Sequence, residues 1–429
     1  MFAISKMEGF VMNYQDLNQL DVQNKSVFLR IDGNVPIAKK KVLDGSRIMA
    51  HCATINHLMG KGAKTIIGTH IGRPELPEAN PKNNINSNRL DTDAQIIFKY
   101  LQKIYGDKIS FADSCVGEDV EQTIRNLHNG HLLLLQNLRY EKGEQSIEES
   151  EKRDFAMTLA TYFDIYVNDA LSVCQNNDAS IAYLPRFTKK TAIGLLLKKE
   201  LHLMEKLLNP VPPAAAFLGG FKVQDKIGAL QKLLKKGFDV FIGGAMRNPF
   251  LRFHKYPIGN SVLPSHYDDL IHQMIEDFRD KIHIPFDVRV GRFEGKGKKK
   301  IGNLRHVDFL QNEEVYAGEE ALDNGPKTMS SYGKIVRQRG FRTMFANGPF
   351  GFIEHRSFRS GTFQLARIFL ENQQALRVYG GGDIIHGFNL FSRYFHKDAA
   401  ELGERCYAGN GVLQFIANDG DLPGLRALY

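Results

Sequence analysis

Cysteine is scarce in this chain, and long apolar runs are absent. Four cysteines occur among 429 residues, far apart and with neither a CxxC pair nor metal-ligand spacing: Cys52, Cys115, Cys174 and Cys406. This usage is typical of reduced thiols, so we expect inert packing residues and a cytoplasmic location. No apolar run reaches the roughly 18 residues that a membrane-spanning helix needs, which argues against a membrane protein.

A P-loop is also missing, because the string GxxxxGK[ST] does not occur. Positive charge is in excess, with a formal net charge of +8. The densest basic run, residues 291–300, contains only one aromatic residue, Phe293, and we expect a solvated loop or hairpin tip there. The charge therefore indicates small polyanionic substrates, with no nucleic-acid and no membrane partner.

Apolar, strand-like segments alternate with amphipathic helical segments along the chain. The strand candidates end near Ile31, Thr69, Leu135, Val167, Leu218, Ile242, Val288, Phe345 and Val378. In residues 147–163 and 361–373, apolar residues recur every three or four positions, as on one face of a helix. The alternation predicts an α/β fold with doubly wound, mostly parallel sheets, and the length suits two or three domains.

Residues 218–234, LGGFKVQDKIGALQKLL, join an apolar strand to an amphipathic helix. Gly219 and Gly220 allow a tight turn, and the free N–H groups at a helix N-terminus attract anions. Lys222 and Lys226 lie four residues apart, so on a helix they share one face. This pattern indicates phosphate binding, although a solvated lysine pair beside an ordinary glycine turn is the alternative.

A second glycine-rich turn, RVYGGGDII, covers residues 377–385. Here Gly380, Gly381 and Gly382 precede Asp383, at the point where a helix would begin. A carboxylate in this place can bind the Mg²⁺ ion of a nucleotide, or it can cap the helix. Asn347 follows another apolar strand in MFANGPFGFIE, residues 344–354.

The first half of the chain carries a different set of polar residues. Each follows an apolar run or its turn: Arg30, Asp32 and Asn34, then Arg47, His70, Arg73 and Arg139. In a parallel sheet such residues gather at the carboxyl ends of the strands, where open α/β sheets bind ligands. They predict a basic surface for phosphate and carboxylate groups.

These segments resemble those of phosphoglycerate kinases, from QDLNQLDVQNKSVFLRIDGNVP near the start to GDLPGLRAL near the end, with DIYVNDALS and NGPKT between them. The resemblance implies two doubly wound domains that face each other across a cleft. It places 3-phosphoglycerate on the first and Mg·ATP on the second, with formation of ADP and 1,3-bisphosphoglycerate and the reverse. It further implies an acceptor domain in residues 1–192, a connecting helix in 193–209, a nucleotide domain in 210–404, and a return to the first domain in 405–429. We expect a monomer, and because the resemblance begins after Met12, we expect an upstream start or a short tail before it.

The resemblance also assigns residues to roles. The acceptor-binding residues are Arg30, Asp32, Asn34, Arg47, His70, Arg73 and Arg139. On the nucleotide side stand Gly219, Gly220, Lys222, Lys226, Asn347, Glu354, Gly380, Gly381, Gly382 and Asp383. We expect Arg47, Lys222 and Lys226 to be catalytic and Asp383 to hold Mg²⁺.

Several positions depart from the family pattern. Asn176 and Asp178 replace an Arg and a His of the acceptor loop, Ile384 replaces a hydroxyl residue, and Asn410 interrupts a glycine stretch. Two alternatives to the kinase hypothesis follow. The first two changes suggest a paralogue for another anionic acceptor, and the last two suggest a non-catalytic nucleotide-binding scaffold protein.

Overall fold

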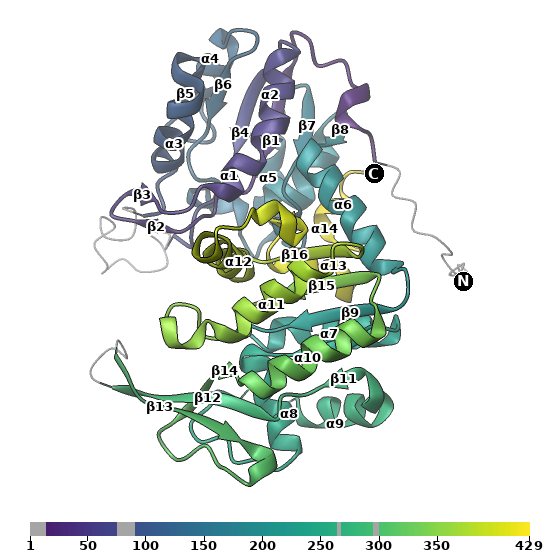
Figure 1. Ribbon diagram of the computed structural model, residues 1–429. Helices are drawn as coiled ribbons and strands as arrows, with labels where there is room; N and C mark the ends of the chain where they lie inside the picture. The colour runs from purple at the N-terminus through teal and green to yellow at the C-terminus, as the bar shows by residue number, and fades with distance from the viewer. Residues whose placement is uncertain (1–13, 75–90, 264–266, 295–299) are drawn as a thin grey trace. The chain divides into compact units, whose positions relative to one another are not determined.

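The computed structural model describes residues 14–74, 91–263, 267–294 and 300–429 (Figure 1). The chain divides into two compact units, a first unit of residues 1–202 and 421–429 and a second unit of residues 203–420. The expected leader at residues 1–12 lies outside the described residues, as does the centre of the basic run, residues 295–299. No helix in the described part of the chain is long and apolar enough to cross a membrane.

The first unit contains a parallel sheet with the strand order β5-β6-β4-β1-β7-β8. Its strands are β1 (Ser26–Arg30), β4 (Lys64–Gly68), β5 (Ile109–Phe111), β6 (Leu132–Leu134), β7 (Ile165–Asn168) and β8 (Lys190–Ile193). A small antiparallel pair, β2 (Ile37–Ala38) and β3 (Lys41–Val42), follows β1. Its helices are α1 (Ser46–Ala50), α2 (Cys52–Gly60), α3 (Gln95–Tyr105), α4 (Glu118–Asn126), α5 (Glu149–Ala160) and α14 (Pro423–Arg426).

Alternate residues of these strands build the core of the first unit. Val27, Leu29 and Ile31 pack with Ile55 of α2 and Ile97 of α3 on one face of the sheet. Because successive residues of a strand point to opposite faces, Phe28 instead stacks on Tyr166, with ring centroids 5.8 Å apart. The sheet is therefore buried on both faces, as the apolar runs predict.

The second unit contains a parallel sheet with the order β11-β10-β9-β15-β16-β17. Its strands are β9 (Ala214–Leu218), β10 (Asp239–Ile242), β11 (Ile282–His283), β15 (Thr343–Asn347), β16 (Leu376–Gly380) and β17 (Glu404–Cys406). A second sheet is antiparallel, with the order β13-β12-β14, from β12 (Asp287–Glu294), β13 (Lys300–Asp308) and β14 (Glu320–Asn324). The helices are α7 (Gln224–Lys235), α8 (Arg247–Phe253), α9 (Asp268–Asp277), α10 (Pro326–Arg339), α11 (Ser360–Glu371), α12 (Gly382–Phe395) and α13 (Asn410–Ala417).

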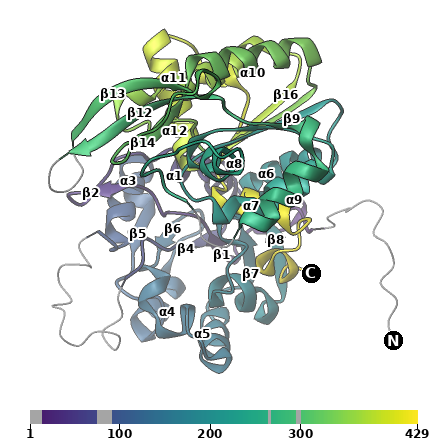
Figure 2. The ribbon, with the colours of Figure 1, turned by 90° about the horizontal axis from the view of Figure 1, so that it is seen from below.

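Helices cover both faces of the parallel sheet in the second unit (Figures 1 and 2). Phe217 of β9 and Phe241 of β10 pack among apolar residues of α10, α11 and α12, including Phe369. The rings of Phe217 and Phe241 are nearly parallel, and their centroids lie 4.7 Å apart. Helix α7 packs against α13 and presents Ile227 and Leu230 as buried residues.

The predicted fold class is confirmed, since both units are α/β with mostly parallel sheets. The strand expected near Val288 is part of the antiparallel sheet instead. The division between the units falls between His202 and Leu203, within helix α6 (Leu195–Leu208). The return to the first unit begins at Asp421 rather than near residue 405, because β17 is hydrogen-bonded to β16 in the second unit.

Candidate active site

The acceptor-type residues of the first unit lie where its strands end. Arg30 is the last residue of β1, Asp32 and Asn34 follow it, and His70 and Arg73 follow β4. The side chain of Arg30 is fully buried and donates from Nε to Ser180 Oγ at 3.1 Å. Arg73 is exposed.

Asp32 and Arg47 form an ion pair at this edge. Arg47 Nη1 lies 3.0 Å from Asp32 Oδ2 and 2.9 Å from the carbonyl oxygen of Asn34. Burial alone would raise the pKa of Asp32, but the charge of Arg47 and hydrogen bonds from Ser172 and Asn34 outweigh it and lower that pKa to about 2. Asp32 is thus ionised and fixes the Arg47 guanidinium, whose Nε and Nη2 groups make no hydrogen bond to a described residue.

His70 is neutral in this site, so it adds no positive charge to the basic surface that the sequence predicts. Burial, and then the charge of Arg30, lower the pKa of His70 to about 3. Its Nδ1 lies 3.3 Å from Arg30 Nη2. Because a guanidinium only donates, Nδ1 accepts this bond and Nε2 carries the proton. His70 can therefore offer an anion a hydrogen bond but no charge.

Arg139 has a carboxylate neighbour inside the site. Its Nη1 donates to the carbonyl oxygen of Gly72 at 2.6 Å, and its Nη2 lies 3.8 Å from Asp178 Oδ2. The Arg139 Nε group is buried and has no partner among the described residues. Asp178 thus partly neutralises a residue that we expect to bind the acceptor.

Glu144 is a fully buried carboxylate next to this pair, and the sequence did not indicate it. It accepts hydrogen bonds from Ser180, from N at 2.8 Å and from Oγ at 2.6 Å. Burial, and then the negative charge of Asp178, raise the pKa of Glu144 to about 7, against the lowering effect of Arg30. Ser180 links it to Arg30, so the acid lies within the hydrogen-bond network of the acceptor residues.

A buried histidine and a buried aspartate support the loop after β1, and neither was predicted from the sequence. His51 Nε2 accepts a hydrogen bond from the backbone N–H of Asp32 at 3.1 Å, and His51 Nδ1 lies 2.9 Å from Asp169 Oδ2. Asp169 Oδ1 accepts from the backbone N–H groups of Leu196 and Leu197 at the start of α6, at 2.9 and 3.2 Å. Asp169 falls within DIYVNDALS and directly follows β7. Its position after an apolar strand could have indicated a functional residue.

In the second unit, Lys226 and Asn347 connect helix α7 to the ends of β15 and β16. Lys226 Nζ donates to Asn347 Oδ1 at 2.8 Å, and Asn347 Nδ2 donates to the carbonyl oxygen of Gly380 at 2.6 Å. Burial and the nearby charge of Lys222 lower the pKa of Lys226 to about 8, while Asp225 and Asp383 oppose that shift. A neighbouring anion favours the ammonium form, so a bound phosphate would raise this pKa.

Lys222 lies before the helix rather than on it. Helix α7 begins at Gln224, so the two lysines do not form the expected pair one turn apart within it. Lys222 is exposed and makes no hydrogen bond or ion pair with a described residue. It sits on the turn with Gly219 and Gly220, where Gly220 has a φ of +83°.

Asp383 belongs to the first turn of α12 but is not its N-cap. Gly381 holds that position, and no side chain caps the helix. The exposed carboxylate of Asp383 makes no hydrogen bond to a described residue, so the capping alternative is not supported. In the described residues no group of three or more His, Cys, Asp or Glu side chains could hold a metal ion. One free carboxylate fits Mg²⁺ that arrives with nucleotide phosphates, because such ions take only one or two protein ligands.

A cavity of about 420 Å³ adjoins Asp383. Its lining includes Asp383, Glu354 and Gly220 from the predicted set. It also includes residues that the sequence did not indicate, among them Ala245, Asn248, Phe293, Leu322 and Phe352. The size suits a bound small molecule.

Arg247 is a buried arginine of the same lining. Its Nη1 donates to Asn324 Oδ1 at 3.0 Å and to the Phe350 carbonyl oxygen at 3.1 Å. Burial lowers its pKa to about 10, against the charge of Asp323. Its burial depends on contacts with Asn324 and Phe350, which lie far along the chain, so only the structure reveals it.

Comparison with known proteins identifies the family. The family model for phosphoglycerate kinase matches residues 17–397. The chain belongs to the phosphoglycerate kinase family. Among curated relatives, the phosphoglycerate kinase of Wolbachia pipientis subsp. Culex pipiens (strain wPip) is 32% identical over 424 residues, covering 97% of this chain and 99% of the relative. That of Aquifex aeolicus (strain VF5) is 30% identical over 420 residues, covering 97% and 98%.

Solved phosphoglycerate kinases share the fold. The enzyme from Pyrococcus horikoshii OT3 matches with a TM-score of 0.79 and 26% identity, over 96% of this chain and 98% of that one. The enzyme from Coxiella burnetii matches with a TM-score of 0.75 and 27% identity, over 97% and 98%. As a phosphoglycerate kinase, the protein is a phosphotransferase that acts on phosphoglycerate. Nothing in these matches favours the paralogue or the scaffold alternative.

Proposed function

We propose that the protein catalyses reversible phosphoryl transfer between ATP and 3-phosphoglycerate, giving ADP and 1,3-bisphosphoglycerate, in glycolysis and gluconeogenesis. The observation that carries the proposal is the chain of hydrogen bonds from Lys226 through Asn347 to Gly380, beside the free Asp383 carboxylate. It joins α7, the helix after the glycine turn that follows β9, to the ends of β15 and β16 in one sheet. In a kinase family this arrangement supports a nucleotide phosphate site.

In the first unit we assign acceptor binding to Arg30, Asp32, Asn34, Arg47, His70, Arg73 and Arg139. Asp32 orients Arg47 through the 3.0 Å ion pair, and Arg47 keeps donors that can neutralise charge on the transferring phosphoryl group. His70 would donate from Nε2, and Arg139 would supply charge to the anionic end of the acceptor. The acceptor carboxylate is already ionised at neutral pH, so no general base is needed.

In the second unit we assign nucleotide binding to the turns at Gly219, Gly220 and Gly380 to Gly382, with Lys222, Lys226, Asn347 and Glu354. The exposed Lys222 and the buried Lys226 would contact phosphate oxygens, since phosphoryl transfer depends mainly on alignment and charge stabilisation. Asp383 would hold Mg²⁺. The ion, when bound, neutralises nucleotide phosphate charge and makes the terminal phosphorus more electrophilic.

We also propose that the protein acts as a monomer in the cytoplasm. Two observations support this. Both ligand sites are assigned to residues of one chain, and none of the four cysteines, all of them buried, forms a disulfide. Analytical ultracentrifugation tests the first part of the proposal.

Calorimetry with ADP tests the role of Asp383. We expect Asp383→Ala to weaken binding of Mg·ADP by about 10- to 150-fold, the loss for one charged interaction, and to leave binding in EDTA almost unchanged. Asp269→Ala is the matched control, because Asp269 occupies the same position in the first turn of α9 and is also exposed. Equal affinity of the native protein with Mg²⁺ and with EDTA would contradict the metal role, and no nucleotide binding at all would contradict the proposed function.

A further inference from the structure

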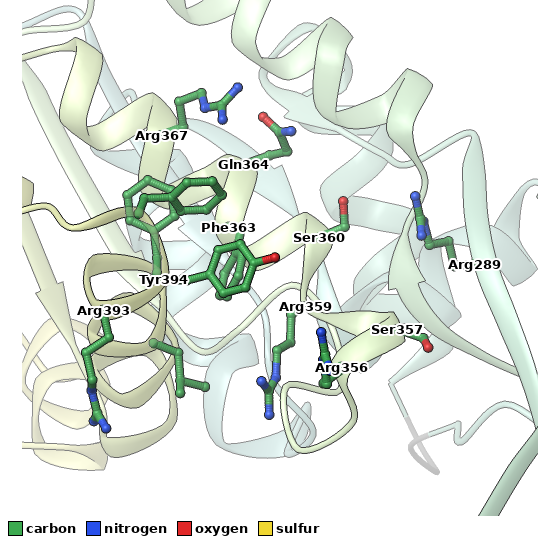
Figure 3. Close-up of a pocket in the computed structure, with 13 residues that line it drawn as sticks. Arg289, Arg356, Ser357, Arg359, Ser360, Phe363, Gln364, Arg367, Arg393 and Tyr394 are labelled. Atoms are coloured by element: carbon green, nitrogen blue, oxygen red, sulfur yellow. The ribbon is translucent and has the colours of Figure 1, made fainter.

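A second cavity in the second unit, of about 510 Å³, is lined by five arginines. Arg289 comes from β12, Arg356 and Arg359 from the segment before α11, Arg367 from α11, and Arg393 from the last turn of α12 (Figure 3). The lining contains no Asp or Glu and shares no residue with the cavity beside Asp383. This cavity is called the arginine pocket below.

The charge of the arginine pocket is not paired within the described chain. None of the five arginines forms an ion pair with a described carboxylate. Arg359 donates only to the backbone carbonyl oxygens of Ile353 and Glu354, at 2.5 and 3.4 Å, and Arg367 lies 5.9 Å from the ring centroid of Phe395. By contrast, Arg337 on α10 pairs with Glu371 at 3.7 Å.

One carboxylate, Asp323, interacts electrostatically with Arg289. Its Oδ atoms already accept hydrogen bonds from the backbone N–H groups of Gly361 and Asn324, between 2.9 and 3.2 Å. Burial raises the pKa of Asp323 to about 7, so it is only partly ionised near neutral pH. It therefore cannot balance five guanidinium groups, and an anionic ligand would.

Aromatic rings complete the arginine pocket. Tyr394 is 64% exposed and Phe395 38% exposed, so two adjacent large rings of the lining are open to solvent. The ring of Phe363 lies 6.0 Å from that of Tyr394 and 5.9 Å from that of Phe395. Figure 3 shows the Phe363 and Tyr394 rings with the arginines arranged around them. Exposed rings beside guanidinium groups are suited to stacking on a planar ring, as in nucleotide recognition.

We propose that the arginine pocket is a second ligand site, for a nucleoside di- or triphosphate, separate from the site beside Asp383. Several guanidinium groups match a ligand with more than one phosphate, and the rings match its base. The volume falls within the roughly 300 to 1,000 Å³ of small-molecule sites, so one nucleotide fits the pocket.

Equilibrium dialysis of the full chain with labelled ADP tests this inference. We expect two ADP molecules per chain, and we expect Arg367→Gln with Arg393→Gln to weaken one of the two sites by at least about tenfold. Both arginines are exposed, so this variant should fold, and thermal unfolding checks that it does. Arg337→Gln is the matched control and should retain both sites, because that arginine already has a carboxylate partner.

A second variant tests the aromatic part of the pocket. Tyr394→Ala should weaken ADP binding at the second site but leave binding of inorganic tripolyphosphate there unchanged, because only the base stacks. One ADP per chain in the native protein, or two equally tight sites in the double arginine variant, would overturn the inference. In either case the proposed kinase function stands, since it depends on the site that Asp383→Ala weakens.

Discussion

The carboxylate of Asp178 lies inside the proposed acceptor site and contacts three side chains. It is 3.8 Å from Arg139 Nη2, and it accepts hydrogen bonds at 3.2 Å from Gln145 Nε2 and from Asn176 Nδ2. At the corresponding positions of the family pattern, an Arg and a His stand where this chain has Asn176 and Asp178. Relative to that pattern, the site therefore has one phosphate donor fewer and one negative charge more. The added charge is that of Asp178, which lies beside Arg139.

Changes at these two residues should alter acceptor affinity. We predict a high KM for 3-phosphoglycerate in the native protein, and a lower KM in the double variant Asn176→Arg, Asp178→His. One charged hydrogen bond changes affinity by about 10- to 150-fold, so the fall in KM should not exceed this range. Steady-state kinetics measures it, with Asn177→Arg as the control for added charge on the same loop. A low native KM that the double variant does not improve would mean that these substitutions do not determine affinity.

Glu144 should make stability depend on pH. Its pKa is raised in the folded state from 4.5 to about 7, so its stabilising contribution is present below 4.5 and is lost as the pH rises through about 7. Each unit of raised pKa corresponds to about 1.4 kcal/mol. We predict that the free energy of unfolding falls less between about pH 5 and about pH 8 in Glu144→Gln than in the native protein. Urea denaturation at both pH values measures the free energy of unfolding. An equal fall in the variant and in the native protein would show that Glu144 is ionised at both pH values.

At the scale of elements, the nucleotide-side loops are packed backbone against backbone. A Cβ atom on Gly219 would lie 2.3 Å from the Pro349 carbonyl oxygen, and one on Gly244 would lie 2.2 Å from the Gly220 nitrogen. The loops after β9, β10 and β15 thus approach more closely than any side chain would allow. Their mutual support holds Gly220 in the wall of the cavity beside Asp383.

Gly244→Ala should disrupt this packing. Gly244 has a φ of +55°, and Gly237, with a φ of +88°, has no atom within 4 Å of its added Cβ. Both substitutions carry the left-handed strain of about 1–2 kcal/mol, but only Gly244→Ala adds a clash with backbone. We predict that Gly244→Ala weakens ADP binding and lowers the melting temperature more than Gly237→Ala does. Equal effects of the two variants would mean that the loop contact does not support the site.

The sequence predicted the parts of the site that depend on local pattern. Apolar runs located the strands, and the polar residues after them, such as Arg30, Lys226 and Asp383, follow from where each run ends. It did not predict the antiparallel sheet, because β12 and β13 carry many charged residues and the buried positions of β12 do not alternate across its register shifts. Nor could it predict that Arg139 pairs with Asp178 or that Arg247 is buried, since both depend on contacts between distant segments.

At the scale of the whole molecule, each unit holds the residues that we assign to one substrate of the proposed reaction. The acceptor residues, with the supporting His51 and Asp169, lie in the first unit, and the glycine-rich turns with Lys226 and Asp383 lie in the second. Asp169 also accepts hydrogen bonds from the start of α6, the helix along which the chain passes from one unit to the other. Of the departures from the family pattern named above, Asn176 and Asp178 lie in the first unit and Ile384 and Asn410 lie in the second.

A coupled assay of the full chain tests the central claim most directly. The protein is mixed with Mg·ATP and either 3-phosphoglycerate or one of a small panel of other phosphorylated acids, and release of ADP is followed. The account predicts ADP release that requires both Mg²⁺ and 3-phosphoglycerate and is faster with 3-phosphoglycerate than with any other acid of the panel. Release that is absent with 3-phosphoglycerate, or faster with another acid, would contradict it.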